Sequence, residues 1–479
     1  MSESALSPRR RLLILAICCM SLLIVSLDNT VLNVALPSMR EDLHTTIAGM
    51  QWTVDAYTLV LASLLMLAGS TADRIGRRKV FKAGLVLFTL GSVLCSLAPN
   101  LESLVAFRMV QAVGGSMLNP VAMSIITNTF TDPRERARAI GVWGGVVGIS
   151  MAAGPVVGGL LTDTVGWRSI FWINVPVGLA ALLLTWRYVP ESRAPRPRRV
   201  DPVGQLLVIA LLGSLTYAII EAPAVGLPAV IPYAVLAVLA LAGLLLYEPR
   251  RREPLIDLRF FRSAPFSGAT VIAVSAFAAL GGFLFLNTLY LQDVRGLSAL
   301  HAGLFMLPMA AMTFVCAPLS GRLVGARGPR IPLIVAGVSM AACGLLFAVF
   351  RAGTSTALLF TGYVLFGLGF GMVNAPITNT AVSGMPRSQA GVAAAVASTS
   401  RQTGQTLGVA VIGSVLATGA GATGAGATTT AWWIITGCGL SVLLVGLATS
   451  GPWARATAER TALRLESAEA RVPADSRRS

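Results

Sequence analysis

Residues 22–37 read LLIVSLDNTVLNVALP, an apolar stretch of membrane-helix character with one carboxylate, Asp28, near its middle. Two further stretches repeat this combination: QWTVDAYTLVLASLLM at 51–66 contains Asp55, and LVAFRMVQAVGG at 104–115 contains Arg108. A charged side chain near the bilayer centre costs at least ~2.5 kcal/mol, so such groups usually mark an ion path, a proton relay or a ligand site. The three residues therefore point toward proton-coupled transport.

Apolar runs of this kind recur along nearly the whole chain. The 479 residues are 55% hydrophobic and 12% charged, and the mean hydropathy is +0.74, far above the range of soluble domains. A run of ~20 apolar residues crosses the ~30 Å hydrocarbon layer. We predict an all-α polytopic membrane protein of the cell membrane, multi-pass, with fourteen transmembrane helices at 12–36, 49–71, 80–98, 101–128, 138–162, 168–189, 203–221, 227–247, 266–290, 300–322, 331–350, 355–380, 390–417 and 430–450.

The distribution of basic residues supports this topology. With a cytoplasmic N-terminus, the inner segments hold 31 of the 37 Lys and Arg residues, and two more, Arg108 and Arg401, lie inside helices. The outer loops hold four, namely Arg40, Arg168, Arg295 and Arg351. Because positive charge concentrates in cytoplasmic loops, both termini are expected in the cytoplasm. The net charge of +16 thus reflects topology and predicts no nucleic-acid partner.

An internal repeat divides the chain. GSTADRIGRR from Gly69 is echoed 252 residues later by GRLVGARGPR from Gly321, and two further segment pairs match at nearly the same offset. Two parallel six-helix halves are typical of alternating-access secondary transporters, which bind their substrate between the halves. The expected organisation is a cytoplasmic N-terminus at 1–11, a six-helix bundle at 12–189, basic loops with two inserted helices at 190–265, a second six-helix bundle at 266–450 and a cytoplasmic tail at 451–479.

Several motifs resemble one family. They are LDNTVLNVALP in the first helix, G-x-x-x-D-R-x-G-R-R-K from Gly69 to Lys79, R-x-x-Q-x-x-G from Arg108, GPVVGG from Gly154 and WRSIFWINVPVG from Trp167. Over residues 11–450 the chain resembles the fourteen-span drug:proton antiporters of the major facilitator superfamily, the EmrB/QacA-like group. It departs at Ala112 and Ser150, where the family pattern usually has glycine. The resemblance implies the major facilitator fold and multidrug or antibiotic efflux by antiport.

Helix depth places Asp28, Asp55 and Arg108 in one layer, each ~9–12 Å below the outer boundary. Our hypothesis makes Asp28 the principal proton carrier, because its hydration and its distance to Arg108 can change with conformation. Asp55 would be a second acid that recognises a cationic drug or shares the proton. Arg108 would bias proton release, as the resemblance also implies. The alternative is a static ion pair that ties the helices together.

Other segments carry candidate roles. The inner loop contains Gly69, Asp73, Arg74, Gly76, Arg77 and Arg78. Asp73 is placed to pair with the neighbouring bundle and to act as a conformational latch. The alternative is a solvated basic loop that only fixes the topology. The antiporter motif of the fifth span, with Gly154, Pro155, Gly158 and Gly159, predicts close packing and a kink. Candidate cavity residues are Asn33, Gln111 and Arg401; for Arg401, substrate contact and carbonyl capping are both open.

The sequence also excludes several classes of protein. The only lysines, Lys79 and Lys82, do not form a G-K-[ST] loop, and H-E-x-x-H and G-x-S-x-G are absent, so we expect neither an ATP-driven pump nor an enzyme. The two histidines and six cysteines indicate no metal site. We predict a monomer without cofactors that uses the proton gradient to export a small hydrophobic drug, cationic in some cases. An exporter of an endogenous metabolite, peptide or siderophore is the alternative.

Overall fold

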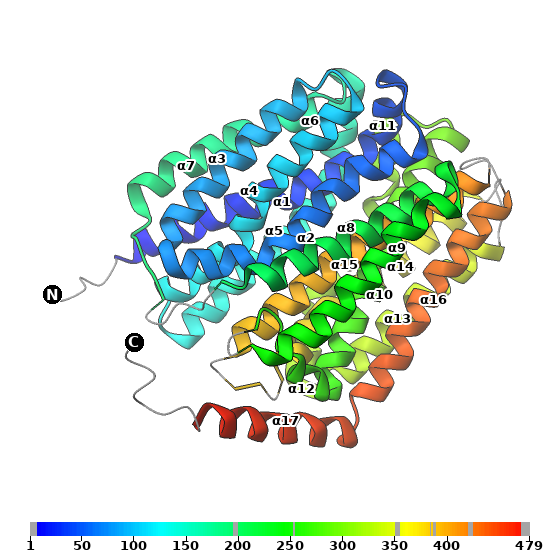
Figure 1. Ribbon diagram of the computed structural model, residues 1–479. Helices are drawn as coiled ribbons and strands as arrows, with labels where there is room; N and C mark the ends of the chain where they lie inside the picture. Colours follow the sequence, from blue (N-terminus) through cyan, green and yellow to red (C-terminus); the bar gives the residue numbers. More distant parts are fainter. Residues whose placement is uncertain are drawn as a thin grey trace.

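The computed structural model describes residues 7–194, 200–251, 254–349, 355–383, 385–386, 389–419 and 425–470. Arg351, one of the four predicted outer-loop basic residues, lies outside these ranges. Long helices dominate the fold (Figure 1). Their bounds are Pro8–Asp42 (α1), Ile47–Ile75 (α2), Arg77–Ser96 (α3), Leu101–Thr129 (α4), Pro133–Thr164 (α5), Ser169–Trp172 (α6), Asn174–Tyr188 (α7), Pro202–Val225 (α8), Leu227–Tyr247 (α9), Ala264–Leu289 (α10), Ala299–Phe305 (α11), Leu307–Arg327 (α12), Arg330–Val349 (α13), Thr356–Val382 (α14), Ala390–Thr418 (α15), Ala425–Thr449 (α16) and Pro452–Ala470 (α17).

Each of the fourteen predicted spans has a helical counterpart, and two of them are broken. The sixth span is divided into α6 and α7, and the tenth into α11 and α12. In the described part of the chain, thirteen segments are long and apolar enough to cross a membrane. The exception is α15, whose 29 residues suffice in length but include Arg401 and two glutamines, Gln402 and Gln405. The predicted all-α membrane fold is confirmed.

The helices pack as two groups with an insertion between them. Helices α1 to α7 contact one another, and so do α10 and α12 to α16; Figure 1 shows the first group in blue and cyan and the second in green to orange. The insertion, α8 and α9, forms a hairpin whose α8 lies against both α2 and α15. Helices far apart in sequence therefore meet along a seam between the groups, which we call the two halves.

The ends of the bundle differ in how closely the halves approach. We call the end with the start of α1 the terminal face and the opposite end the far face. At the far face the halves are joined: Arg40 Nη1 lies 2.9 Å from Asp293 Oδ2, and Gln292 donates to the Val34 carbonyl at 2.8 Å. Toward the terminal face, a side chain added at Gly145 of α5 would meet nothing within 4 Å. The same holds for Gly141 and Gly144 of α5 and for Gly321 and Gly325 of α12.

Helix α17 was not predicted, because the sequence reading treated 451–479 as a tail. In Figure 1 it lies across the end of the second half, on the terminal face. Its side chains at Ala454, Ala458 and Leu465 are buried, and Thr457 Oγ1 accepts from the Ala264 amide at 2.9 Å. Spacings of four and seven residues put these small and apolar side chains on one helix face. That face packs against the start of α10.

Candidate functional site

Asp28 and Arg108 form a buried ion pair inside the first half. Asp28 is 3% exposed and Arg108 is 0% exposed; Arg108 Nη1 lies 2.5 Å from Asp28 Oδ2. The other carboxylate oxygen accepts from Gln111 Nε2 and from Asn174 Nδ2, each at 2.8 Å. One cation and two amide donors therefore surround the Asp28 carboxyl group, an arrangement that favours charge-assisted hydrogen bonds.

Arg108 is held from three further directions. Its Nη1 donates to Gln111 Oε1 at 2.7 Å, and its Nε donates to the Thr53 carbonyl at 3.3 Å. The guanidinium carbon also lies 4.3 Å from the centre of the Tyr57 ring, a favourable cation–π arrangement. The buried cation is thus compensated within its own half. Gln111, predicted as a cavity residue, belongs to this charged cluster instead.

Sequence reasoning missed Asn174 and Ser92, which complete the cluster. Ser92 Oγ accepts from Gln111 Nε2 at 2.7 Å and from Asn174 Nδ2 at 3.3 Å. Close helix packing brings them together, because a side-chain atom added at Gly91 of α3 would lie 2.6 Å from the Gln111 backbone. Both are polar residues within apolar runs, which is the signal that could have identified them.

Asp55 lies apart from this cluster. It is 0% exposed, and its Oδ1 accepts a long hydrogen bond, 3.5 Å, from Thr58 Oγ1. Its Oδ2 has no hydrogen-bond partner, and within the described residues no cation lies within 4 Å of it. Thr53, which touches Arg108, precedes Asp55 by two residues, about 200° around the helix. The structure therefore pairs Arg108 with Asp28 and not with Asp55.

Asp55 instead belongs to the seam between α2 and α15. Thr58, one turn below it, accepts from Thr406 of α15 at 2.8 Å. One turn above it, Gln51 donates to the carbonyls of Val409 and Ala410 at 3.2 and 2.7 Å. An ionised Asp55 in such a closed contact would carry a large desolvation cost, because a lone buried charge is very costly.

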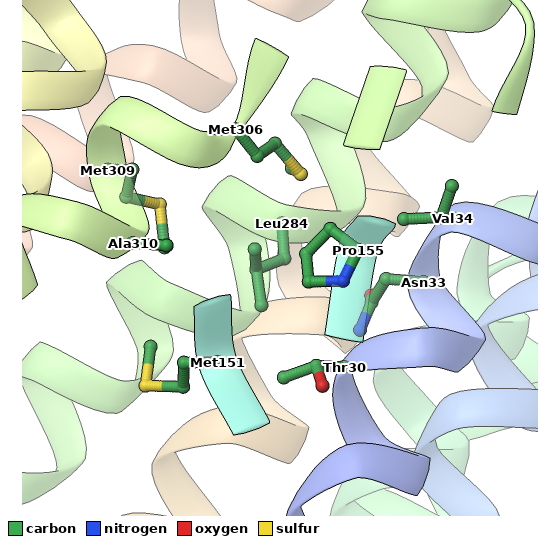
Figure 2. Close-up of a pocket in the computed structure, with 9 residues that line it drawn as sticks. All are labelled: Thr30, Asn33, Val34, Met151, Pro155, Leu284, Met306, Met309 and Ala310. Atoms are coloured by element: carbon green, nitrogen blue, oxygen red, sulfur yellow. The ribbon is translucent and has the colours of Figure 1, made fainter. Parts of the chain in front are cut away.

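A small cavity lies between the halves (Figure 2). Asn33, one of the candidate cavity residues, lines it together with Thr30 and Val34 of α1. The other lining residues are apolar, and three are methionines: Met151, Pro155, Leu284, Met306, Met309 and Ala310. Methionine side chains are flexible and polarizable, so such a wall adapts to apolar groups of different shape.

The glycines of α5 permit close contacts on both sides of that helix. A side-chain atom added at Gly154 would lie 1.9 Å from Thr30 Oγ1, and one added at Gly158 would lie 2.8 Å from the Val31 carbonyl oxygen. On the opposite side, Gly159 approaches α11, the short helix that precedes α12 of the second half, and an added atom would lie 2.4 Å from the Ala299 carbonyl oxygen. Glycine is thus required both within the first half and across the seam.

The basic loop between α2 and α3 bonds within its own half. Asp73 pairs with Arg77, whose Nη2 lies 2.8 Å from Asp73 Oδ1. Gly76 has φ +124°, in the region that favours glycine. The Arg78 amide donates to Glu191 Oε1 at 3.0 Å, and its guanidinium bonds the Trp186 carbonyl. Arg74 is exposed, and a side-chain atom added at Gly69 of α2 would lie 3.8 Å from Pro120 Cβ. In this conformation the ion-pair partner of Asp73 is Arg77, four residues further along the same half.

Arg401 lies on α15 with little compensation. Its Nη2 donates to Thr378 Oγ1 at 2.5 Å, and its guanidinium carbon lies 6.0 Å from the centre of the Phe277 ring. Its Nε has no hydrogen-bond partner, and it forms no ion pair with the carboxylates of the described residues.

A many-helix membrane fold in two halves, with buried charges at and beside the seam, defines a secondary transport protein. The chain belongs to the Major Facilitator Superfamily, whose family model matches residues 18–409. The predicted resemblance to this superfamily and to its drug-efflux members is confirmed.

Named relatives span most of the chain. The multidrug resistance protein Stp of Mycobacterium tuberculosis is 39% identical over 85% of this chain and 76% of its own. The tetracenomycin C resistance and export protein of Streptomyces glaucescens is 39% identical over 83% and 74%. The methylenomycin A resistance protein of Streptomyces coelicolor is 36% identical over 82% of each chain.

Solved structures support the fold. A POT family transporter in complex with 5-aminolevulinic acid is 14% identical, with a TM-score of 0.69, covering 92% of this chain and 96% of its own. A bacterial homologue of the lysosomal transporter Spinster, in an inward-facing and unoccupied conformation, is 18% identical, with a TM-score of 0.59, covering 96% and 98%. These similarities establish the architecture of a multi-pass membrane protein.

Proposed function

We propose that this chain exports small hydrophobic drugs or antibiotics from the cytoplasm in exchange for protons, by alternating access. Relatives named for multidrug resistance and antibiotic export, at 35–39% identity, support the substrate class. The observation that carries the mechanism is a pair of buried acids in opposite electrostatic settings. Asp28 faces a cation and two amide donors, whereas the Asp55 Oδ2 atom faces none.

The positive-inside rule assigns the terminal face to the cytoplasm. The halves then join at the outer side, where Asp163 also accepts from the amides of Ala299 and Leu300 at 3.1 and 2.9 Å. The conformation is inward-facing, which is the state that releases protons and takes up drug. Asp28 is in its unloaded form here, and we assign it the principal proton. It is reloaded when the halves rock and its contact with Arg108 loosens.

Asp55 holds a second proton in this state. Because its carboxyl group lies in the contact between α2 and α15, it exchanges that proton only when the outer seam opens. The seam and the protonation of Asp55 are thereby linked, since ionisation would leave an unpaired charge inside the closed contact. Asp73 pairs with Arg77 of its own half in this state and forms a contact with the second half when the cytoplasmic side closes.

The test uses everted membrane vesicles that contain the full chain. A panel of hydrophobic dyes, including ethidium, is added with and without a protonophore, and dye uptake and proton release are recorded together. Uptake that collapses with the protonophore supports proton coupling. Asp28→Asn should abolish dye-driven proton release; undiminished coupling in that variant overturns the assignment. A wild-type chain that moves no dye favours the alternative predicted from the sequence, an exporter of an endogenous metabolite, peptide or siderophore.

A further inference from the structure

Arg401 lies close to the substrate path expected between the halves, and the contacts of its neighbours on α15 show in which direction it faces. Gly404 and Gly408 face α10, where side-chain atoms added to them would lie 2.4 and 2.1 Å from the carbonyl oxygens of Val274 and Ala278. Gln405 faces α1 and accepts from Asn29 Nδ2 at 3.4 Å. Arg401 precedes Gln405 by one helical turn and Gly408 by two, so it lies between the α10 and α1 sides. That direction leads into the seam.

The depth of Arg401 places it near the middle of the membrane. It lies eleven residues into α15, about 16 Å from the first residue. Phe277, the ring nearest its guanidinium, is seven residues from Leu284 on α10, so the two share a helix face and are about 10 Å apart. Leu284 lines the methionine-rich cavity of Figure 2. A basic group and an apolar cavity thus lie along one side of α10, at a separation that a small drug can span.

The turn around Arg401 contains unsatisfied polar atoms. Thr399 Oγ1, Arg401 Nε and Gln402 Oε1 are buried and have no hydrogen-bond partner, and neither does Asn29 Oδ1 across the seam. Buried polar atoms are rarely left without partners. The excess at this one turn indicates a place where a polar group from another molecule, or water, completes the hydrogen bonding.

The charge balance decides what kind of group fits. Arg108 is neutralised by Asp28, and Asp55 is stable in its closed contact only as a neutral acid. Arg401 therefore leaves one uncompensated positive charge along the path in the described part of the chain. A guanidinium matches carboxylates and other oxyanions through parallel N–H donors. It repels a cationic drug in the same place, by Coulomb interaction in a low dielectric.

We propose that Arg401, with Gln402 and Gln405 beside it, binds the oxyanion of the exported molecule, a carboxylate or an ionised phenol, while the methionine-lined cavity holds its apolar body. This inference rests on the proposed export function and narrows its substrate class from hydrophobic drugs in general to hydrophobic acids.

The test compares two dyes that share one scaffold, a xanthene dye with a free carboxylate and no phenol group, and the methyl ester of the same dye. Initial rates of energised uptake into everted vesicles give kcat/KM for each dye. We expect the wild-type chain to prefer the acid. Arg401→Gln should lower the acid-to-ester ratio of kcat/KM about tenfold or more, the size expected for one lost charge-assisted hydrogen bond. Arg401→Lys should keep part of the preference, because it retains the charge but loses the planar donors.

Arg460→Gln is the matched control, because Arg460 is exposed on α17, away from the seam. It should leave the ratio unchanged. If Arg401→Gln does not fold, Arg401→Lys decides by the same ratio. A ratio unchanged by both Arg401 variants, or a wild-type chain that moves the ester but not the acid, overturns the inference and leaves export intact. A wild-type chain that moves neither dye nor ethidium contradicts the proposed function itself.

Discussion

The structural role of the buried Asp28–Arg108 pair can be separated from its role in transport by comparing a single with a double variant. Arg108→Gln removes the cation and leaves Asp28, 3% exposed, without its counter-charge. Breaking a buried pair in this way typically costs about 3–5 kcal/mol. Two amide donors, from Gln111 and Asn174, still bond the carboxylate, and Asp28 can take up a proton. We therefore expect Arg108→Gln to lower the free energy of unfolding by about 3 kcal/mol, the lower end of this range.

The double variant Asp28→Asn with Arg108→Gln removes both charges and keeps side chains that can hydrogen-bond. Its stability should return to within about 1 kcal/mol of the wild-type value, because neutral isosteres often replace a buried ion pair at little cost. Thermal unfolding in lipid nanodiscs, followed by tryptophan fluorescence, measures the difference. The single variant should unfold about 3 °C earlier than the wild-type chain.

Proton coupling is then measured on the same samples. The double variant should be stable and yet release no protons when drug is added, because it has lost the titratable carboxylate. A double variant that couples as well as the wild-type chain would make the pair a static tie between helices. The exposed pair of Arg168 and Asp42, with side chains 41% and 48% exposed, is the matched control. Neutralising both partners there should change stability by no more than about 1 kcal/mol.

Three further changes test the seam. In Gly159→Leu, the first side-chain atom would lie 2.4 Å from the Ala299 carbonyl oxygen, so the variant should hold the far face open. Cysteine-accessibility labelling would measure the opening. A labelling pattern that matches the wild-type chain would contradict the prediction. Arg40→Glu breaks the 2.9 Å pair with Asp293. The equilibrium between the closed and open far face should shift toward the open form by about 1 kcal/mol or less. Adding Asp293→Arg should reverse this shift, and spin-label distances across the far face would measure both changes. Asp55→Asn should leave stability within about 1 kcal/mol, since the acid has no cation to lose, while lowering the proton-to-drug stoichiometry; an unchanged stoichiometry would exclude Asp55 from coupling.

The number of membrane spans could be predicted because a membrane span is a local property. Length and apolar character of ~20 residues decide it, and each predicted span has a helix in the structure. The breaks within the sixth and tenth spans were missed, because they leave the hydropathy of the whole segment unchanged. Helix α17 was missed for the opposite reason, since it is too polar to register as a span. The spacing of Ala454, Ala458 and Leu465 would have indicated one buried face.

The partners of the buried charges could be predicted only in part. Counting residues along a helix gives depth, and depth put Asp28 and Arg108 at one level. It does not give the direction in which each side chain points relative to neighbouring helices. That direction depends on packing: the contacts of Gln51 and Thr58 with α15 orient α2 so that Asp55 faces the seam. The direction of the Asn174 side chain could not be predicted either, so the motif WRSIFWINVPVG, which contains it, did not reveal its contact with Asp28.

The charge of the exported molecule determines which part of the proton gradient drives export. Moving one elementary charge across the membrane potential is worth about 2.3 kcal/mol per 100 mV. When only the proton carried by Asp28 is counted, a monovalent cation leaving makes the exchange electrically neutral, so the pH difference alone drives it. A neutral drug leaving moves one net positive charge inward. A monovalent anion leaving moves two, worth about 4.6 kcal/mol per 100 mV. If Arg401 binds an oxyanion, the resting potential, negative inside, therefore drives both halves of the exchange, and the transporter can concentrate acids outside even where the pH difference is small.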